Sequence, residues 1–269
     1  MTREIDQKLS VLRGELRALG RVLVCFSGGV DSGLLLAVAA AELGRNAVAF
    51  TGISPSLEAG EERDARRFAS DLGVEHECRI TEEMANPNYV SNPANRCYFC
   101  KTELYDTAQR IAAEREIRFI VDGFNVDDHA DHRPGRGAAV ERAVRSPLEE
   151  CGFTKQCIRD AARALGLALW DKPALACLAS RLPTGTAVTS ERLAQVAAAE
   201  QAVRARGFRV VRVRHLGQQA RVEVGSDELP RLDPDTRAGI ARELAAVGFD
   251  QVLFDARGYR RGSLHVIER

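Results

Sequence analysis

The chain has 269 residues, which suffices for a large buried core and for two domains. Its 38 Lys and Arg residues balance 38 Asp and Glu residues, so no overall charge favours nucleic acid or a membrane surface as a partner. The opening MTREIDQKLS is unlike a signal peptide, and the longest apolar run, 34–41, is too short to cross a bilayer. Seven cysteines without an export signal indicate reduced thiols or metal ligands, and we expect a cytoplasmic location.

The first part of the chain alternates predicted strands with predicted helices. Strands are expected over 22–26, 46–51, 75–80 and 118–122, and helices over about 31–43, 57–72, 101–116 and 154–165. This order predicts an α/β fold with a doubly wound, mostly parallel sheet. Two polar stretches, 85–96 and 124–138, are expected to be loops, the second at the carboxyl edge of the sheet, where ligands bind.

The pattern changes after a proline-bounded stretch, KPALACLASRLPTG (172–185), which we interpret as a linker that carries function. Beyond it we expect a helix at 190–206, strands at 208–214 and 220–225, a helix at 235–247 and a strand at 250–255. This αββαβ order is typical of a small α+β domain. We therefore predict two domains, 1–183 and 184–269.

The most informative stretch is RVLVCFSGGVDS (21–32). Its apolar run predicts a strand buried on both faces, and SGGVDS (27–32) predicts a tight turn into a helix. Backbone N–H groups and the helix dipole then make an anion site. No Lys follows the glycines to hold β- and γ-phosphates, so this is not a GxxxxGK[ST] loop. A G-x-S-x-G elbow is excluded because Cys25 replaces its first Gly.

Three cysteines are candidate metal ligands. Cys97 and Cys100 form a C-x-x-C pair at a predicted helix start, which lets both sulfurs reach one metal and favours thiolates. Together with Cys177 of the linker they would leave one iron of a [4Fe–4S] cluster open, or bind zinc with a fourth ligand such as His129 or His132. Ordinary loop cysteines are the simpler alternative.

The remaining cysteines are assigned no chemistry. Cys25 and Cys78 lie in predicted strands and are expected to be inert core residues, whereas Cys151 and Cys157 flank a turn. The stretch DDHADH (127–132) would either hold a divalent ion or form a solvated loop.

Two arginines also allow two interpretations. Arg212 and Arg214 alternate along a predicted strand and therefore project to one face. They would bind a phosphate there, whose oxygens suit guanidinium geometry, or form a salt-bridged surface with Glu223 of the neighbouring strand.

Taken together, these motifs resemble one family. SGGVDS after a first strand matches the PP-loop of the ATP pyrophosphatase superfamily, whose members bind the pyrophosphate portion of ATP and pass AMP to an acceptor. Within it the chain resembles the LarE family, the ATP-dependent sulfur transferases that make the nickel-pincer nucleotide cofactor of lactate racemase. The matching stretches are SGGVDS (27–32), NRCYFCK (95–101), DGFNVDDHADHRPG (122–135), RSPL (145–148), KPALACLASRLPTG (172–185) and VRVRH (211–215).

The resemblance implies a reaction. ATP adenylates a carboxylate of pyridinium-3,5-biscarboxylic acid mononucleotide and releases pyrophosphate, and a sulfur nucleophile then displaces AMP to leave a thiocarboxylate. ATP and Mg²⁺ are implied as cofactors and a small nucleotide as the substrate. LarE relatives form hexamers, so a homo-oligomer is implied as well.

The resemblance also assigns roles to residues. The implied catalytic residues are Cys177, Asp31 and Lys101, with Asp31 also the Mg²⁺ ligand. The implied ATP-binding residues are Ser27, Gly28, Gly29, Asp31, Ser32, Thr51 and Gly123. The implied substrate residues are Ser180, Arg181, Glu200, Arg212 and Arg214, with the last two on the substrate phosphate.

The source of the sulfur stays open at this point. In family members with one active-site cysteine, the residue matching Cys177 gives up its sulfur and becomes dehydroalanine. Cys97 and Cys100 depart from that pattern and resemble members whose three cysteines hold a [4Fe–4S] cluster with a transferable sulfide. Two other functions also stay open, a tRNA thiolase of the same superfamily and a non-catalytic nucleotide sensor. The balanced charge disfavours the thiolase, and the three cysteines disfavour the sensor.

Overall fold

The computed structural model describes residues 2–130, 134–173 and 176–260. The chain divides into two compact units. The first consists of Met1–Ser54, Ala59–Glu83 and Asn95–Leu175, and the second of Pro55–Glu58, Met84–Ala94 and Ala176–Arg269. The domain boundary that we predict near residue 184 stays a prediction. Among the described residues, no helix combines the length and apolar character needed to cross a membrane.

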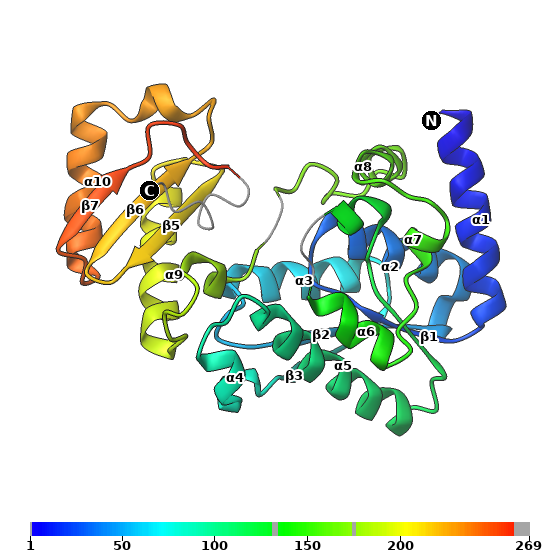
Figure 1. The fold of residues 1–269 in the computed structure, drawn as a ribbon. Helices are drawn as coiled ribbons and strands as arrows, with labels where there is room; N and C mark the ends of the chain where they lie inside the picture. Colours follow the sequence, from blue (N-terminus) through cyan, green and yellow to red (C-terminus); the bar gives the residue numbers. More distant parts are fainter. Residues whose placement is uncertain (1, 131–133, 174–175, 261–269) are drawn as a thin grey trace. The chain divides into compact units, whose positions relative to one another are not determined.

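A four-stranded parallel sheet forms the frame of the first unit (Figure 1). Its spatial order is β3-β2-β1-β4. The strands are β1 (Val22–Cys25), β2 (Ala47–Ile53), β3 (Glu75–Ile80) and β4 (Phe119–Val121). Val24 of β1 lies opposite Ala49 of β2 and Val121 of β4, and every residue of β1 is buried. This confirms the predicted α/β fold with a parallel sheet.

Helices cover both faces of this sheet (Figure 1). On one face lie α1 (Arg3–Leu19), α2 (Val30–Leu43), α3 (Ala59–Asp71) and α8 (Lys155–Ala164). On the other face lie α5 (Arg96–Glu114) and α6 (Gly135–Glu141). Alternate residues of β1 join the two cores, since Val24 packs on the first face and Cys25 on the second. Because alternate residues of β1 face opposite cores, helices cover the sheet on both sides, as in a doubly wound fold.

The order of the sheet reverses at β1. The chain runs from β1 through β2 to β3 and then returns to place β4 on the other side of β1. In open α/β sheets, ligands bind at such a switch point, outside the carboxyl ends of the strands. The turn 27–29 follows β1 and residues 122–125 follow β4. The fold therefore brings two of the predicted functional stretches to one point.

A three-stranded mixed sheet forms the frame of the second unit. Its strands are β5 (Val211–Leu216), β6 (Gln219–Val224) and β7 (Gln251–Phe254), in that spatial order. β5 is antiparallel to β6, whereas β7 is parallel to it. Helices α9 (Ser190–Ala205) and α10 (Pro234–Ala246) pack against one face, over the valines of β5 and β6. The predicted αββαβ order is confirmed.

Two predicted elements in the middle of the chain differ in extent. α5 begins at Arg96 rather than at residue 101, so Cys97 and Cys100 lie inside its first turns. The stretch predicted to be a loop, 85–96, holds a short helix of the second unit, α4 (Pro87–Val90). Asn86 caps α4 through its side-chain oxygen, and a proline opens it, so the residues that indicate a loop here start a helix.

Two further predictions need correction. β5 begins at Val211 rather than at 208, because the N–H groups of Arg209 and Val210 bind the Glu228 carboxylate instead of a neighbouring strand. The polar stretch 124–138 also contains helical turns. The remaining short helices are α7 (Pro147–Glu150), η1 (Gly44–Asn46), η2 (Glu83–Ala85), η3 (Val126–Ala130), η4 (Leu178–Arg181) and η5 (Leu229–Arg231).

Candidate functional site

The SGGVDS turn joins the carboxyl end of β1 to the start of α2. Gly28 has a φ of 78°, a conformation that favours glycine, and Gly29 is the N-cap of α2. The Ser27 N–H donates to the Ser32 hydroxyl over 3.2 Å, and the two serine hydroxyls lie 3.1 Å apart. These contacts fold the turn onto the N-terminus of a 14-residue helix, whose dipole favours an anion.

The end of β4 lies beside this helix start. A Cβ atom on Gly123 would lie 2.7 Å from the Ser32 amide nitrogen and 2.9 Å from the Ser32 Cα atom. Both obstructing atoms are backbone, so a side chain at this position would push the two loops apart. Gly123 therefore permits the close approach of the β4 loop to the SGGVDS turn.

The carboxylate of Asp31 is held from the β4 side. The Asn125 side-chain amide donates to Asp31 Oδ2 over 3.0 Å. Asn125 is fully buried, and its Oδ1 accepts the Asp127 N–H over 3.1 Å, which fixes the end of the amide that faces Asp31. Sequence reasoning missed Asn125, although it lies in the quoted stretch 122–135. An oriented carboxylate at an anion site fits a Mg²⁺ ion, which prefers oxygen ligands.

Thr51 ties the neighbouring strands to this turn. Its buried hydroxyl donates to the Phe26 carbonyl oxygen over 2.6 Å, so it accepts from His76 Nε2 at 2.8 Å. Burial first, and then the charge of Arg66, lower the pKa of His76. The imidazole is therefore neutral at pH 7, with its proton on Nε2. Thr51 thus fixes the residue that precedes Ser27.

Lys101 and Asp122 lie on the α5 side of the sheet. Lys101 Nζ is 5.4 Å from the centroid of the Tyr105 ring. The Tyr105 hydroxyl donates to Asp122 Oδ2 and the Ser146 hydroxyl donates to Asp122 Oδ1, each over 2.7 Å. Burial first, and then the Asp122 charge, raise the pKa of Tyr105 well above its ordinary value. These bonds anchor the residue that precedes Gly123, whereas a catalytic role for Lys101 stays a prediction.

The candidate metal-binding cysteines belong to both units. Cys97 is exposed and Cys100 is half-buried, and their spacing places both on one face of α5. Cys177 is also exposed and precedes η4, and its carbonyl oxygen accepts from Arg181 Nη1 over 2.9 Å. Among the described residues, no three His, Cys, Asp or Glu side chains are gathered as a metal site. Joint binding of a cluster by the three cysteines stays a prediction.

The acidic stretch after β4 takes part in the structure of the first unit. Asp127 Oδ2 accepts from the Lys155 N–H and Asp128 Oδ1 from the Lys155 ammonium, each over 2.7 Å. His129 contacts a glutamate of α7. These three residues therefore make contacts within the first unit, and Asp128 is buried, so it is not part of a solvated loop. The other two candidates of this stretch lie outside the described residues, namely Asp131 and His132.

The other cysteines differ in their surroundings. Cys25 is buried, as predicted, and burial raises its pKa to about 12, so it does not ionise near neutral pH. The prediction that Cys78 is a core residue is wrong, because it lies only half-buried on β3, a strand without a buried residue. Burial raises the pKa of Cys151 to about 11, and Cys157 Sγ lies 3.6 Å from Lys8 Nζ.

In the second unit, two predicted substrate residues form a buried ion pair. Arg181 donates from Nε to Glu200 Oε1 over 2.7 Å and from Nη2 to Oε2 over 3.0 Å. Their exposed fractions are 1% and 0%. Glu200 also accepts from the Val213 N–H and from Arg204 Nη2, over 3.0 and 2.9 Å. Burial is the largest influence and raises the pKa of Glu200, but Arg181, the Val213 N–H and the charge of Arg212 together lower it below its ordinary value. Glu200 therefore joins η4, α9 and β5.

Arg212 and Arg214 share one face of β5, as predicted, while the core valines face the other side. Both arginines are buried. Arg214 donates from Nε and Nη2 to Glu223 Oε2 over 3.0 and 2.8 Å, and from Nη1 to the Ser180 carbonyl oxygen over 3.2 Å. The guanidinium carbon of Arg212 lies 5.0 Å from the centroid of the Tyr259 ring. The predicted ion pair with Glu223 therefore exists for Arg214.

A third arginine lies on the same face. Arg221 of β6 is opposite Arg214 in the register, and its Nη2 lies 3.3 Å from Glu223 Oε1. Burial first, and then the charge of Arg181, lower the pKa of Arg212. Three arginines and one glutamate of β5 and β6 favour an anionic ligand such as a phosphate at this face. Sequence reasoning missed Arg221, although RVEV alternates it with Glu223.

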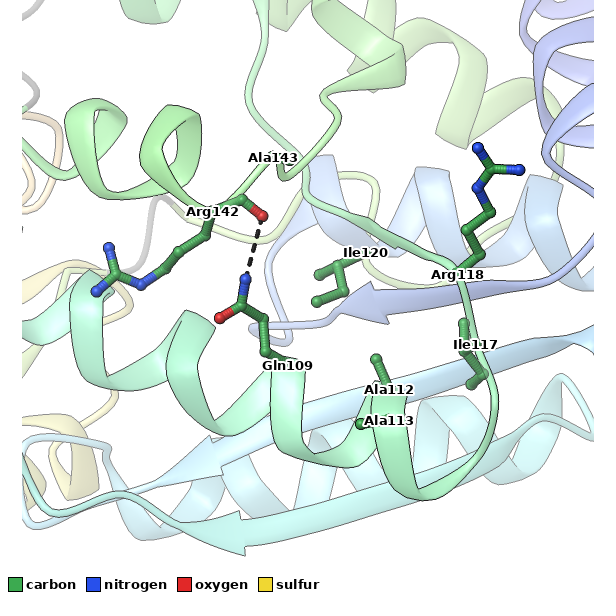
Figure 2. A pocket seen from close by; sticks show the side chains of 8 residues that line it. All are labelled: Gln109, Ala112, Ala113, Ile117, Arg118, Ile120, Arg142 and Ala143. Atoms are coloured by element: carbon green, nitrogen blue, oxygen red, sulfur yellow. Dashed lines mark hydrogen bonds between the residues drawn. The ribbon is translucent and has the colours of Figure 1, made fainter.

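A separate pocket of about 410 Å³ lies in the first unit at the amino end of β4 (Figure 2). Gln109 Nε2 of α5 donates to the Arg142 carbonyl oxygen over 3.4 Å at its wall. This end of β4 is opposite the carboxyl edge that carries the SGGVDS turn, and no predicted site residue lines the pocket. The pocket is therefore not part of the candidate site. Its lining residues are Gln109, Ala112, Ala113, Ile117, Arg118, Ile120, Arg142 and Ala143.

Comparisons with known proteins agree with this geometry. A profile of the asparagine synthase family matches residues 10–92, which include the SGGVDS turn. The chain is 44% identical to an uncharacterised protein of Synechocystis over 97% of this chain and 98% of that protein. It is 34% identical to the pyridinium-3,5-bisthiocarboxylic acid mononucleotide synthase of Lactiplantibacillus plantarum over 96% of this chain and 94% of the synthase.

The chain belongs to the LarE family. A more distant relative is an uncharacterised protein of Methanocaldococcus jannaschii, 24% identical over 89% of this chain and 91% of that protein. Because the match to the synthase spans nearly both chains, the LarE resemblance applies to both units.

Proposed function

We propose that the protein is an ATP-dependent sulfur transferase. It adenylates a carboxylate of pyridinium-3,5-biscarboxylic acid mononucleotide and converts that carboxylate to a thiocarboxylate. The observation that carries the proposal is the SGGVDS turn on the N-terminus of α2, with Asp31 oriented by Asn125, in a chain alignable with the named synthase over nearly its full length. A cytoplasmic location and a homo-hexamer stay predictions.

In the first step a substrate carboxylate oxygen attacks the α-phosphorus of ATP. The bond from that phosphorus to the bridging oxygen of pyrophosphate breaks, and pyrophosphate leaves with the electron pair. Backbone N–H groups at Gly28, Gly29 and the start of α2 would bind the phosphate charge that grows on the leaving group, since Gly29 is the N-cap of α2. Asp31 would hold Mg²⁺, which when bound neutralises phosphate charge.

In the second step a sulfur nucleophile attacks the acyl carbon, and AMP leaves with the electron pair of the broken acyl–oxygen bond. The sulfur comes from Cys177 itself or by way of a [4Fe–4S] cluster. If Cys177 attacks, a thioester forms, and loss of the Cα proton of Cys177 with breakage of its Cβ–S bond leaves the thiocarboxylate and dehydroalanine. Cys97 and Cys100 suit two ligand positions of such a cluster, because their thiols share one face of α5, and Cys177 would be the third. When bound, this cluster would supply a sulfide at its open iron.

The second unit would hold the acceptor. A mononucleotide carries one phosphate, and the face with Arg212 and Arg214 has the charge to bind it. Glu200 keeps Arg181 in place through two hydrogen bonds, and Arg214 in turn donates to the Ser180 carbonyl oxygen. We therefore assign Arg212 and Arg214 to direct phosphate contact, and Arg181 and Glu200 to holding the loop that carries Ser180.

The test is acceptor-dependent pyrophosphate release by the purified full-length chain. The proposal expects release with ATP, Mg²⁺ and pyridinium-3,5-biscarboxylic acid mononucleotide, together with AMP and a product heavier by the difference between sulfur and oxygen. Release with unmodified tRNA instead of the mononucleotide would identify a tRNA thiolase. ATP binding without release for either acceptor would identify a nucleotide sensor.

A further inference from the structure

Lys172 brings a positive charge to the SGGVDS turn from a distant part of the chain. Its Nζ donates to the Gly28 carbonyl oxygen over 3.1 Å and to Glu61 Oε2 over 2.6 Å. The exposed fractions of the Lys172 and Glu61 side chains are only 19% and 15%. Gly28 and Lys172 are 144 residues apart in the sequence, and all three residues belong to the first unit.

Lys172 compensates for the absence of a lysine within the SGGVDS motif. The SGGVDS turn has no Lys after its glycines, whereas a GxxxxGK[ST] loop uses that residue for the β- and γ-phosphates. The structure places an ammonium group on the carbonyl oxygen of the first glycine of the turn. A lysine from outside the motif thus brings to the turn the positive charge that the motif itself lacks.

Without a cation beside it, the Glu61 carboxylate would repel a phosphate bound at the SGGVDS turn. A Cβ atom on Gly28 would lie 3.5 Å from Glu61 Oε2, so the carboxylate lies directly beside the turn. A half-buried carboxylate repels phosphate unless a cation compensates it. Lys172 supplies that cation. The ammonium group has more N–H donors than its bonds to Gly28 and Glu61 use, so it can also bind a phosphate oxygen.

Contacts of neighbouring residues fix the backbone position of Lys172. Arg159 of α8 donates from Nη2 to the Lys172 carbonyl oxygen over 2.8 Å and from Nη1 to the Trp170 carbonyl oxygen over 3.0 Å. Leu169 packs so closely on α2 that a Cβ atom on Gly33 would lie 2.5 Å from Leu169 Cδ2. The segment is therefore anchored by backbone and apolar contacts, and Glu61 orders the Lys172 side chain beside the turn.

We propose that Lys172 binds the β- and γ-phosphates of ATP and remains with pyrophosphate as it leaves. Glu61 holds the ammonium in place before ATP arrives. The inference rests on the proposed function in one respect, that the SGGVDS turn is the ATP site. It adds a phosphate ligand from the first residue of the stretch 172–185, which also carries Cys177.

Nucleotide titration by calorimetry tests this, with the full-length chain, Mg²⁺ and no acceptor. We expect Lys172→Ala to weaken binding of ATP and of inorganic pyrophosphate by about tenfold or more, as expected for a charge-assisted contact, and to leave AMP binding within about twofold. Lys172→Arg should restore most of the affinity for ATP. Lys8→Ala is the matched control, because Lys8 is 22% exposed and likewise bonds a backbone carbonyl and a glutamate.

Glu61→Gln separates a phosphate ligand from a structural tether. If Lys172 binds phosphate, removal of the carboxylate leaves ATP binding unchanged or tighter. A loss of ATP affinity in Glu61→Gln equal to that in Lys172→Ala, or equal losses for ATP and AMP in Lys172→Ala, would overturn the inference in favour of a tether. Wild-type protein that does not bind ATP would overturn the ATP site itself, and with it the proposed function. Wild-type binding with an unaffected Lys172→Ala variant would overturn only the role of Lys172.

Discussion

The Asn125 side-chain amide donates a hydrogen bond to Asp31 Oδ2 over 3.0 Å. The two residues follow different strands, β1 and β4, on the two sides of the point where the sheet order reverses. Because Asn125 is fully buried and its oxygen is bound to the Asp127 N–H, the amide holds Asp31 in one orientation. The candidate Mg²⁺ ligand is therefore positioned by the fold before any ligand arrives.

We predict that Asp31→Ala and Ser27→Ala abolish acceptor-dependent pyrophosphate release while the protein stays folded. The first removes the carboxylate that would hold Mg²⁺, and the second removes a hydroxyl that contacts Ser32 inside the turn. Asn125→Ala should instead raise the Mg²⁺ concentration needed for half-maximal release, because Asp31 remains but loses its orientation. Pyrophosphate assays over a Mg²⁺ series measure both effects. Unchanged release in folded Asp31→Ala protein would exclude this turn as the ATP site.

A second prediction concerns Gly123→Ala. The new Cβ atom would lie 2.7 Å from the Ser32 amide nitrogen, so β4 or the start of α2 has to shift. We expect pyrophosphate release to fall by about a hundredfold, in keeping with misplacement of a catalytic group by an ångström. Gly137→Ala is the matched control, because its new Cβ atom would meet only Tyr98 ring carbons at 3.7 Å. Gly152→Ala is unsuitable as a control, because Gly152 has a positive φ that disfavours alanine. Equal activities of the two variants would refute the close-approach argument.

The sequence predicts the elements better than the contacts between them. The strand at 75–80 has the same bounds in the structure, although none of its residues is buried. By contrast, the bond from Asn125 to Asp31 depends on β4 pairing beside β1, and Lys172 reaches Gly28 across 144 residues. No local pattern carries such long-range pairing, so residue types alone did not indicate Asn125 or Lys172.

In the second unit, too, the sequence predicts a strand correctly but not the contacts between elements. Alternation along β5 correctly places Arg212 and Arg214 on one face. The same alternation does not predict the ion pair between Glu200 and Arg181, because this pair forms only when η4 packs against α9. The resemblance groups these residues as substrate ligands, and the structure separates a buried pair from an arginine-rich sheet face. Direct contact of Glu200 with the substrate stays a prediction.

The buried pair leads to a stability prediction. Glu200→Gln should lower the free energy of unfolding by about 3–5 kcal/mol near pH 7, because the buried charge of Arg181 loses the carboxylate that compensates it. The folded-state pKa of Glu200 lies below its ordinary value of 4.5, so its stabilising contribution is present above that pH and is lost as the pH falls through the folded-state value. The difference between wild type and Glu200→Gln should therefore shrink in acid.

Urea unfolding at several pH values measures this difference. Glu243→Gln is the matched control, because Arg206 contacts Glu243 with the same two-bond geometry but the side chains are 32% and 42% exposed. An exposed pair is worth about 0–1 kcal/mol. If Glu200→Gln costs no more than Glu243→Gln, the buried pair does not hold η4 in place.

The arginine-rich face leads to a binding prediction. Arg212→Ala together with Arg214→Ala should leave ATP affinity unchanged and weaken acceptor binding by about tenfold or more per arginine. Calorimetric titration with the mononucleotide and with Mg²⁺-ATP measures the two affinities separately. Arg206→Ala, which removes an exposed arginine of the same unit, should change neither. Loss of ATP binding with an intact acceptor affinity would reverse the assignment of the two units.

The last prediction is that Cys97, Cys100 and Cys177 together ligate one [4Fe–4S] cluster. A helix that begins at Arg96 places the first two thiols on one face of α5, near the N-terminal end, where a helix favours thiolates. A cluster with three protein ligands leaves one iron open to carry the sulfide that the second step requires, whereas a fully ligated one does not. Protein purified without oxygen should be brown, with about four irons per chain.

Single substitutions distinguish this cluster from its rivals. Cys97→Ala, Cys100→Ala or Cys177→Ala should each bleach the protein, whereas Cys157→Ser, at a half-buried thiol of α8, should keep the colour. Zinc would give colourless protein with stoichiometric metal, because its closed structural sites use four protein ligands and absorb no visible light. Iron-free protein that becomes lighter by one sulfur and two hydrogens at Cys177 after turnover would establish the sacrificial route instead. In that case Cys97 and Cys100 would be dispensable for a single turnover, and the cluster would be refuted.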